Sequence, residues 1–468
     1  MKLNASNAAG ATVLLHDSLQ GNGVPGGGSI LFSDVEEIIT CRDESEIEQA
    51  FSKIEDALDR GCHVAGGFCY ELGYYLEPHL IRKRRDLDGP LFQVGVFRDA
   101  KRMEPADLDT FLNQQEICAC VDSHLSIIES EAAYRVNIAA IQELIFAGDI
   151  YQANYTFPLQ FSLQGGIWDF YRQVIPYQNV AFGAVLDLPD IRCASFSPEL
   201  FFRKTGSRIE ARPMKGTTPR GATPDEDTRA INFLRSDEKN RAENLMIVDL
   251  IRNDLGRLAE IGSVTVRDAF HVETYETLHQ MTSTIEADIR PGISLMDIFR
   301  NMFPCGSVTG APKIRAMEII ADLESHPRGL YTGAIGYITP TRDMCFSVPI
   351  RTVCFDRHNR ATIGIGSGIV ADSIDADEYD ECLLKARFLV KALHVDLVYR
   401  MPQVGLIETM RAVDGIIPLL DDHMARLINS MKIFGIGAAE AAMRAALCDE
   451  VQGTSGEIRL RLQLENDG

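Results

Sequence analysis

The stretch CASFSPELFFRKTGSRIEARPMKGT, residues 193–217, decides the fold. Residues 193–202 carry apolar runs on either side of a Ser-Pro pair, which predicts a strand, a turn and a second strand. Residues 209–214 then predict the return strand of a hairpin. Such pairing would bring Glu199 and Lys215 near each other at strand ends, although the sequence leaves the strand register open.

Lys215 lies between a proline-methionine pair and a glycine, and its amine is a candidate nucleophile. A lysine with a pKa near its ordinary value of about 10.4 is protonated at neutral pH, so attack requires burial or neighbouring positive charge. Arg212 and Arg220 flank the lysine and suggest such charge. The alternative is a surface turn, because proline and glycine commonly mark turns.

Composition limits the possible functions. With 468 residues, 46% of them hydrophobic, the chain can bury a large core and forms either two domains or one domain with an appendage. A net charge of -21 argues against nucleic-acid and anionic-membrane partners. We find no secretory leader and no run of about 18 apolar residues, so we expect a cytoplasmic protein with reduced cysteines.

Strand-like and helix-like segments alternate irregularly along the chain, which predicts an α+β fold. Apolar residues at helical spacing predict helices over 131–147, 237–258 and 377–393. The last helix carries Glu378, Glu381 and Lys385 on one face. Taken alone, that face would be interpreted as a solvated stripe of ion pairs.

Two glycine-rich segments could bind an anion. Residues 303–313 predict a loop that opens a helix, where free N–H groups attract carboxylate or phosphate, and residues 364–370 could offer a second row of donors. Neither segment matches a P-loop or a dinucleotide fingerprint. Close packing of strands is the alternative explanation for such glycines.

Together these motifs resemble the chorismate-utilising enzymes, which include anthranilate, aminodeoxychorismate, isochorismate and salicylate synthases. The resemblance rests on residues 197–199, 213–217, 243–254, 305–313, 329–337, 351 and 364–385. It implies an α+β fold like that of anthranilate synthase component I, a large two-sheet sandwich with helices on the outside, which we assign to residues 1–396.

The resemblance also implies a set of site residues. A magnesium ion would be held by Glu243 and Glu381, with Glu378 close by, and would bridge to the ring carboxylate of chorismate; magnesium prefers such oxygen ligands. The residues expected to bind substrate are His279, Thr309, Tyr331, Arg351, Gly366, Ser367, Gly368 and Lys385.

Within the family, lysine at 215 together with glutamine at 152 resembles the aminodeoxychorismate synthases, component I. Anthranilate synthases carry a small residue in place of Lys215, and isochorismate and salicylate synthases place a lysine where this chain has Gln152. The resemblance implies that Glu199 protonates the C4 hydroxyl while Lys215 attacks C2. Ammonia then displaces the lysine and gives 4-amino-4-deoxychorismate, a precursor of 4-aminobenzoate and folate.

The resemblance further implies that ammonia comes from a separate glutaminase subunit, because we find no glutaminase triad in this sequence. Two alternatives remain. The first is anthranilate synthase component I or another chorismate-utilising enzyme. The second is a non-catalytic regulatory subunit that binds a small acid, although such a binder would need neither the acid Glu199 nor the nucleophile Lys215.

Residues 397–468 form a separate short α+β appendage in our interpretation, and Pro402 lies where the preceding helical pattern has ended. They resemble the opening of class IV pyridoxal-phosphate enzymes, including aminodeoxychorismate lyase, with Arg426 in the place of an arginine that binds the cofactor phosphate. The Schiff-base lysine of that family would lie beyond Gly468. We therefore expect pyridoxal phosphate only in a completed segment, and no lyase activity from these residues. The alternative is a small segment that packs on the main domain.

Overall fold

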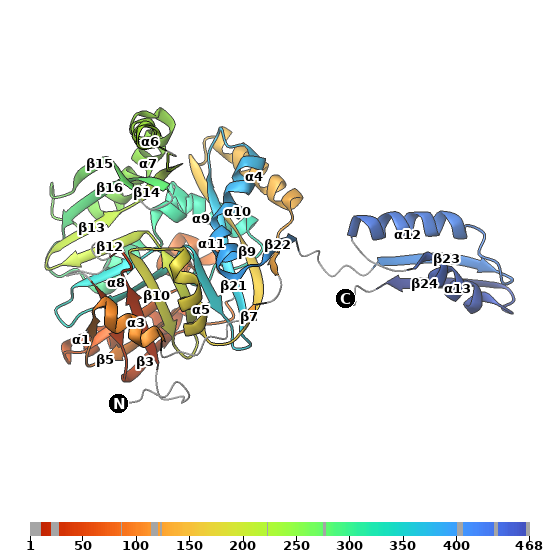
Figure 1. The fold of residues 1–468 in the computed structure, drawn as a ribbon, viewed down its shortest axis with the longest axis horizontal. Helices are drawn as coiled ribbons and strands as arrows, with labels where there is room; N and C mark the ends of the chain where they lie inside the picture. The colour runs from red at the N-terminus through yellow and green to blue at the C-terminus, as the bar shows by residue number, and fades with distance from the viewer. Residues whose placement is uncertain are drawn as a thin grey trace. The chain divides into compact units, whose positions relative to one another are not determined.

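The computed structural model describes residues 11–19, 28–85, 87–113, 120–121, 124–221, 223–274, 278–399, 406–434 and 439–464. The chain divides into two compact units, Met1–Val398 and Tyr399–Gly468 (Figure 1). Our boundary after residue 396 stays a prediction, and the division into compact units falls two residues further along the chain, after Val398.

Two large sheets form the first unit. Over the described residues, the first sheet has 12 strands and pairs them mostly antiparallel. Its strands, in spatial order, are β22 (Asp396–Tyr399), β8 (His124–Ile127), β9 (Gln152–Gln164), β21 (Arg360–Ile369), β20 (Thr352–Phe355), β11 (Arg192–Ser197), β10 (Phe182–Asp187), β1 (Thr12–His16), β2 (Ser29–Phe32) and β6 (Lys101–Met103), with β17 (Gly310–Ala311) and β7 (Cys120–Val121) also on β9.

The second sheet has 10 strands over the same residues. Its strands, in spatial order, are β14 (Met214–Pro219), β16 (Leu278–Asp288), β13 (Arg208–Arg212), β12 (Leu200–Thr205), β19 (Met344–Ser347), β18 (Ala334–Ile338), β4 (His63–Phe68), β5 (Phe92–Phe97) and β3 (Val35–Cys41), with β15 (Thr265–Thr274) also on β16.

The chain crosses from the first sheet to the second at Pro198 and Glu199. The stretch 193–202 therefore holds two strands, as expected, but β11 and β12 lie in different sheets and do not pair. The hairpin predicted with its return strand over residues 209–214 is confirmed: β12 pairs with β13, and Leu200 lies opposite Arg212. Glu199 thus lies at the crossover, next to the start of β14.

Helices cover the sheets. Those of the first unit are α1 (Glu44–Asp59), α2 (Leu72–Leu76), α3 (Pro105–Asn113), α4 (Glu131–Phe146), α5 (Ile167–Val174), α6 (Pro224–Ser236), α7 (Glu238–Gly256), α8 (Leu295–Met302), α9 (Lys313–Leu323), α10 (Asp375–Lys385) and α11 (Arg387–Leu393), with 3-10 turns η1 (Pro78–Lys83), η2 (Ile175–Tyr177) and η3 (Gly306–Val308). The single helix predicted over 377–393 is in fact two, α10 and α11, which meet at Ala386.

The core has two layers. One buried cluster lies between the sheets and joins side chains such as Leu186 of the first sheet to Ile335 of the second. The other lies between the second sheet and helices α1, α7 and α8, where Phe68, Phe299 and Phe346 contact one another. This is the α+β two-sheet sandwich with outer helices that the sequence predicts.

The second unit pairs β23 (Leu406–Val413) with β24 (Glu457–Leu464) and packs α12 (Leu420–Phe434) and α13 (Glu440–Val451) against them. Its strand β23 alternates buried and exposed residues, as a one-sided sheet requires. Among the described residues of the whole chain, no helix is long and apolar enough to cross a membrane.

Candidate active site

The amine of Lys215 lies at the meeting point of the two sheets. Lys215 is in β14 of the second sheet, and its Nζ approaches Gly368 in β21 of the first. A Cβ built at Gly368 would lie 2.9 Å from that Nζ and 2.2 Å from Nε2 of Gln152. The missing side chain of Gly368 therefore makes the space in which these two groups meet.

Gln152, which our sequence analysis used with Lys215 to separate the enzyme types, is a buried polar side chain. Its side chain is 1% exposed, yet neither Oε1 nor Nε2 has a hydrogen-bond partner among the described residues. Buried amides are normally satisfied, and an exception asks for an explanation. This amide lies beside the Lys215 amine, where a bound molecule would meet it.

Glu199 is buried and has the character of an acid. Its Oε1 accepts a hydrogen bond from Ser307 Oγ at 2.5 Å. Burial raises the pKa of Glu199 to about 7, although the Ser307 hydroxyl, the charge of Lys215 and the Met214 backbone N–H each oppose that rise. A substantial fraction of this carboxyl is therefore protonated at neutral pH.

The acidic side chains of α7 and α10 face the same amine. Burial raises the pKa of Glu243, the positive charge of Lys215 opposes that rise, and the negative charge of Glu378 adds to it. Partial burial opposes ionisation of Glu381, but the Lys385 amine, 2.8 Å from Glu381 Oε1, outweighs it and lowers the pKa. Lys215 acts on Glu381 in the same direction.

These three glutamates are only partly free to bind a cation. Glu378 accepts a hydrogen bond from Ser373 Oγ at 2.7 Å, and Glu381 is paired with Lys385. Over the described part of the chain, no three His, Cys, Asp or Glu side chains form a ready metal cluster. Burial raises the pKa of Glu243 and the negative charge of Glu378 adds to the rise, so a cation here would stabilise the charged carboxylates; a magnesium ion completed by substrate oxygens fits that role.

The glycine-rich strand β21 brings several predicted substrate contacts to one place. Lys385 Nζ donates to the Gly366 carbonyl at 2.6 Å, and Ser367 Oγ lies 3.3 Å from the hydroxyl of Tyr134. The Tyr331 ring packs directly on Gly364, where an added Cβ would lie 2.2 Å from it. Close packing thus explains part of this glycine pattern.

Thr309 and Arg351 lie in the loops around that strand. Thr309 is fully buried, and its hydroxyl donates to the carbonyls of Cys305 and Gly306 at 3.3 and 3.2 Å. Arg351 adopts a positive φ of 52°, and its carbonyl accepts from the Phe196 N–H at 3.0 Å.

His279 lies in a hydrogen-bonded network of its own. It is fully buried in β16, with Nε2 2.8 Å from Asp227 Oδ1 and Nδ1 2.9 Å from Thr274 Oγ1. Because both ring nitrogens are occupied, His279 reaches a substrate only if one of these bonds opens. Its assignment as a substrate contact stays a prediction.

The two arginines that flank Lys215 in the sequence are paired elsewhere. Arg220 makes a two-pronged pair with Asp227, and Arg212 Nη1 lies 3.2 Å from Glu273 Oε1. The charges that interact with the Lys215 amine are the carboxylates of Glu199, Glu243 and Glu381, not these guanidinium groups. The expectation that Arg212 and Arg220 supply positive charge beside Lys215 therefore does not match the structure.

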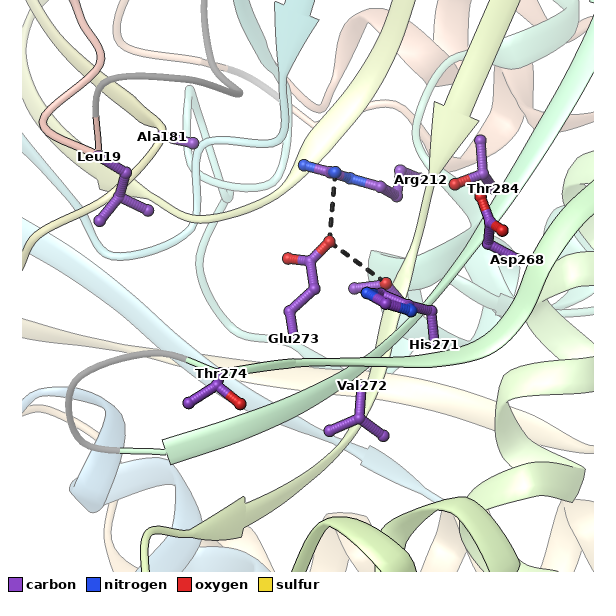
Figure 2. Close-up of a pocket in the computed structure, with 10 residues that line it drawn as sticks. Leu19, Ala181, Arg212, Asp268, His271, Val272, Glu273, Thr274 and Thr284 are labelled. Carbon is purple, nitrogen blue, oxygen red and sulfur yellow. Dashed lines mark hydrogen bonds and ion pairs between the residues drawn. The ribbon is translucent and has the colours of Figure 1, made fainter. Parts of the chain in front are cut away.

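Arg212 and Glu273 form their ion pair in the lining of a cavity of about 680 Å³ (Figure 2). The cavity is also lined by His271 and Thr282, the latter within 3.4 Å of Glu273. None of the predicted site residues lines it. The site around Lys215 is thus defined by convergent polar groups and not by this opening.

In the second unit, Arg426 does not present a free guanidinium. It pairs with the carboxylate of Glu408, which is 7% exposed and also accepts from His423 Nδ1 at 2.6 Å. The guanidinium lowers the pKa of Glu408. A phosphate would meet a neutralised pair there, so these residues do not fit a cofactor-phosphate site as they stand, and we derive no chemistry through pyridoxal phosphate.

Three comparisons place the chain among known proteins. Residues 27–391 match the model of the chorismate binding enzyme family, and residues 405–468 match that of the class IV aminotransferases. Aminodeoxychorismate synthase component 1 of Klebsiella aerogenes is 35% identical over 347 residues, covering 70% of this chain and 76% of that one.

Other relatives are matched over smaller shares of their length. Aminodeoxychorismate synthase of Streptomyces griseus is 42% identical over 59% of this chain and 38% of its own. Anthranilate synthase component 1 of Aquifex aeolicus is 39% identical over 54% of this chain and 51% of its own length. A solved structure of a putative isochorismate synthase from Bacillus anthracis has a TM-score of 0.65 at 18% identity, covering 84% of this chain and 98% of that one, and so shares the fold.

Proposed function

Because this chain belongs to the chorismate binding enzymes, we propose that it is an aminodeoxychorismate synthase component I, which converts chorismate and ammonia to 4-amino-4-deoxychorismate. The observation that carries the proposal is the position of the Lys215 amine, held against Gly368 and Gln152 and facing the carboxyl of Glu199. A lysine nucleophile next to a protonated carboxyl is the pair that covalent substitution of a hydroxyl needs.

The reaction divides into two displacements. Glu199 donates its proton to the C4 hydroxyl as Lys215 attacks C2, so that water leaves and a covalent adduct forms. Ammonia then attacks C4, and Lys215 leaves from C2. Splitting one difficult substitution into two is the usual gain of covalent catalysis.

Glu243 and Glu381, with Glu378 nearby, would hold a magnesium ion. The ion would supply positive charge to the ring carboxylate of chorismate, which an acidic chain otherwise repels. Lys385 and the backbone of Gly366 lie next to these carboxylates and would orient the substrate. Tyr331, Arg351, Ser367 and Thr309 complete the proposed pocket.

We propose that ammonia reaches the site from a separate glutaminase subunit. The relatives matched over most of their length are named as component 1 proteins, which supports a partner subunit. In the absence of that partner, added ammonium at alkaline pH would replace it, because only unprotonated ammonia is a nucleophile.

The experiment is product identification. Protein incubated with chorismate, magnesium and ammonium should form 4-amino-4-deoxychorismate, and Lys215→Ala should abolish it, whereas Lys101→Ala on an exposed strand should not. Anthranilate as the product would favour the anthranilate synthase alternative. Chorismate binding without turnover would favour a regulatory subunit. Undiminished activity of Lys215→Ala would refute the covalent route.

A further inference from the structure

A buried ion pair lies behind the proposed site and takes no part in the chemistry described so far. Arg328 and Glu324 are 2% and 4% exposed at their side chains, and Arg328 Nη2 lies 2.7 Å from Glu324 Oε1. The guanidinium also stacks over the Tyr70 ring, with its carbon 4.4 Å from the ring centre. Replacing such a pair by apolar residues often costs nothing, so stability alone is a weak reason for it.

The guanidinium holds two backbone segments of the site together. Nη1 donates to the Val308 carbonyl at 2.8 Å, and Nη2 donates to the Asn154 carbonyl at 2.6 Å. Val308 belongs to the turn η3, and Asn154 lies in β9, two residues after Gln152. The same strand gives a second link, because the Asn154 N–H donates to the Thr309 carbonyl at 2.8 Å.

Glu324 fixes the guanidinium in its turn. Its Oε1 accepts from both the N–H and the hydroxyl of Thr156 at 2.9 Å, so the carboxylate is itself tied to β9. Glu71 accepts from the backbone N–H groups of Arg328 and Gly329 at 2.7 and 3.0 Å. A planar fork held at this many points leaves its carbonyl partners little freedom.

The turn that Arg328 holds carries Ser307, the residue next to Val308. Ser307 Oγ is the donor to Glu199 Oε1. We propose that Arg328, fixed by Glu324, is a positioning residue that holds turn η3 against β9 and so presents the Ser307 hydroxyl to Glu199. This inference rests on the proposed role of Glu199 as the acid of the reaction.

The titration of Glu199 can report on the hydrogen bond from Ser307, because few groups face the carboxyl. They are the Lys215 amine on β14, the Met214 backbone N–H, the Ser307 hydroxyl and the Cys305 thiol. Burial raises the pKa of the thiol to about 12, so it stays neutral over the useful range. A donor to a carboxylate stabilises its charged form, and its loss therefore raises the pKa of Glu199.

The test compares Ser307→Ala, Arg328→Lys and the double variant, with Arg203→Lys as a control on a strand ion pair away from the turn. The carboxyl band of Glu199 is followed by infrared spectroscopy against pH and identified by its loss in Glu199→Gln. In parallel, adduct formation with chorismate and magnesium, without ammonium, is followed by mass spectrometry.

We expect each single variant to raise the Glu199 midpoint by about one pH unit, a tenfold change in its ionisation equilibrium. The double variant should shift no further than Ser307→Ala, because both changes break one chain of contacts. An unshifted midpoint in Arg328→Lys, or additive shifts, would overturn the positioning role. If Arg328→Lys does not fold, Glu324→Gln takes its place under the same criterion.

The two measurements separate this inference from the proposed function. A shifted infrared midpoint with an adduct rate indifferent to Glu199 ionisation would leave Arg328 as the positioning residue and remove Glu199 as the acid. Parallel shifts of midpoint and rate would support both.

Discussion

Substituting Gly368 by alanine tests the central contact of the site with the smallest possible change. The backbone at Gly368 is an extended strand paired with Asn154, so alanine is compatible with its conformation. The added Cβ would lie 2.9 Å from Lys215 Nζ and 2.2 Å from Gln152 Nε2, whereas ordinary contacts begin at 3.4 Å. The amine must therefore move by at least about 0.5 Å and the amide by more than about 1 Å.

Both obstructing atoms end flexible side chains, so they can move without unfolding the protein. We expect a stability loss near the lower end of the roughly 1–3 kcal/mol that overpacking costs. The effect on chemistry should be larger, because misplacing a reacting group by about 1 Å can cost about 100-fold in rate. Adduct formation with chorismate should thus slow by about 10- to 100-fold.

The assay is the rate of mass increase on Lys215 under single-turnover conditions, with thermal unfolding measured in parallel. Gly256→Ala, at the end of α7 where an added Cβ meets nothing within 4 Å, is the matched control. A Gly368→Ala protein that reacts at the wild-type rate would show that the attacking amine is not the one held against Gly368, and the proposed geometry would fail.

Three further outcomes follow from the same structure. Glu199→Gln should slow adduct formation by about 100-fold or more and should stabilise the protein at pH 8 by roughly 3 kcal/mol, measured by denaturant titration. The sign follows because burial raises the pKa of Glu199 in the folded protein to about 7. Glu199 contributes fully to stability below its pKa in the unfolded chain, and this contribution is lost as the pH rises through 7. A Glu199→Gln protein no more stable than wild type at pH 8 would contradict this reasoning. Glu243→Gln should weaken magnesium binding to the chorismate complex by more than about tenfold in calorimetry, while the exposed Glu238→Gln on the same helix should bind normally. Leu427→Ala should destabilise the second unit by about 2–5 kcal/mol, seen as faster hydrogen exchange in residues 406–464, unlike the exposed Leu419→Ala.

The fold, and the closeness of Lys215 to Glu199, were readable from the sequence because their signals are local. Alternating strands and the Lys215 and Glu199 motifs each occupy a few adjacent residues, and the structure brings both side chains together as expected. For most of the chain, the sequence did not reveal which strands pair with each other. Nothing in the stretch 193–202 says that β11 and β12 belong to different sheets, because the crossover is decided by packing over the whole core.

The supporting residues escaped prediction for a different reason. Glu324 and Arg328 have the i, i+4 spacing typical of a solvated helix pair, and only the fold reveals that they are buried. Ser307 is an ordinary hydroxyl in a glycine-rich loop until the turn places it on Glu199. The prediction that Arg212 and Arg220 lie beside the Lys215 amine was wrong, because adjacency in sequence does not determine which carboxylate a guanidinium contacts.

The lone amide of Gln152 sets a thermodynamic trade-off for the whole protein. Its donor and its acceptor have no partner among the described residues, and each costs about 1–3 kcal/mol unless water or a bound molecule satisfies it. Burying this amide without a protein partner therefore favours folding less than burying an apolar side chain of similar size would. A bound molecule that hydrogen-bonds to the Gln152 amide removes this cost. The free energy that folding loses there is thus regained as binding affinity.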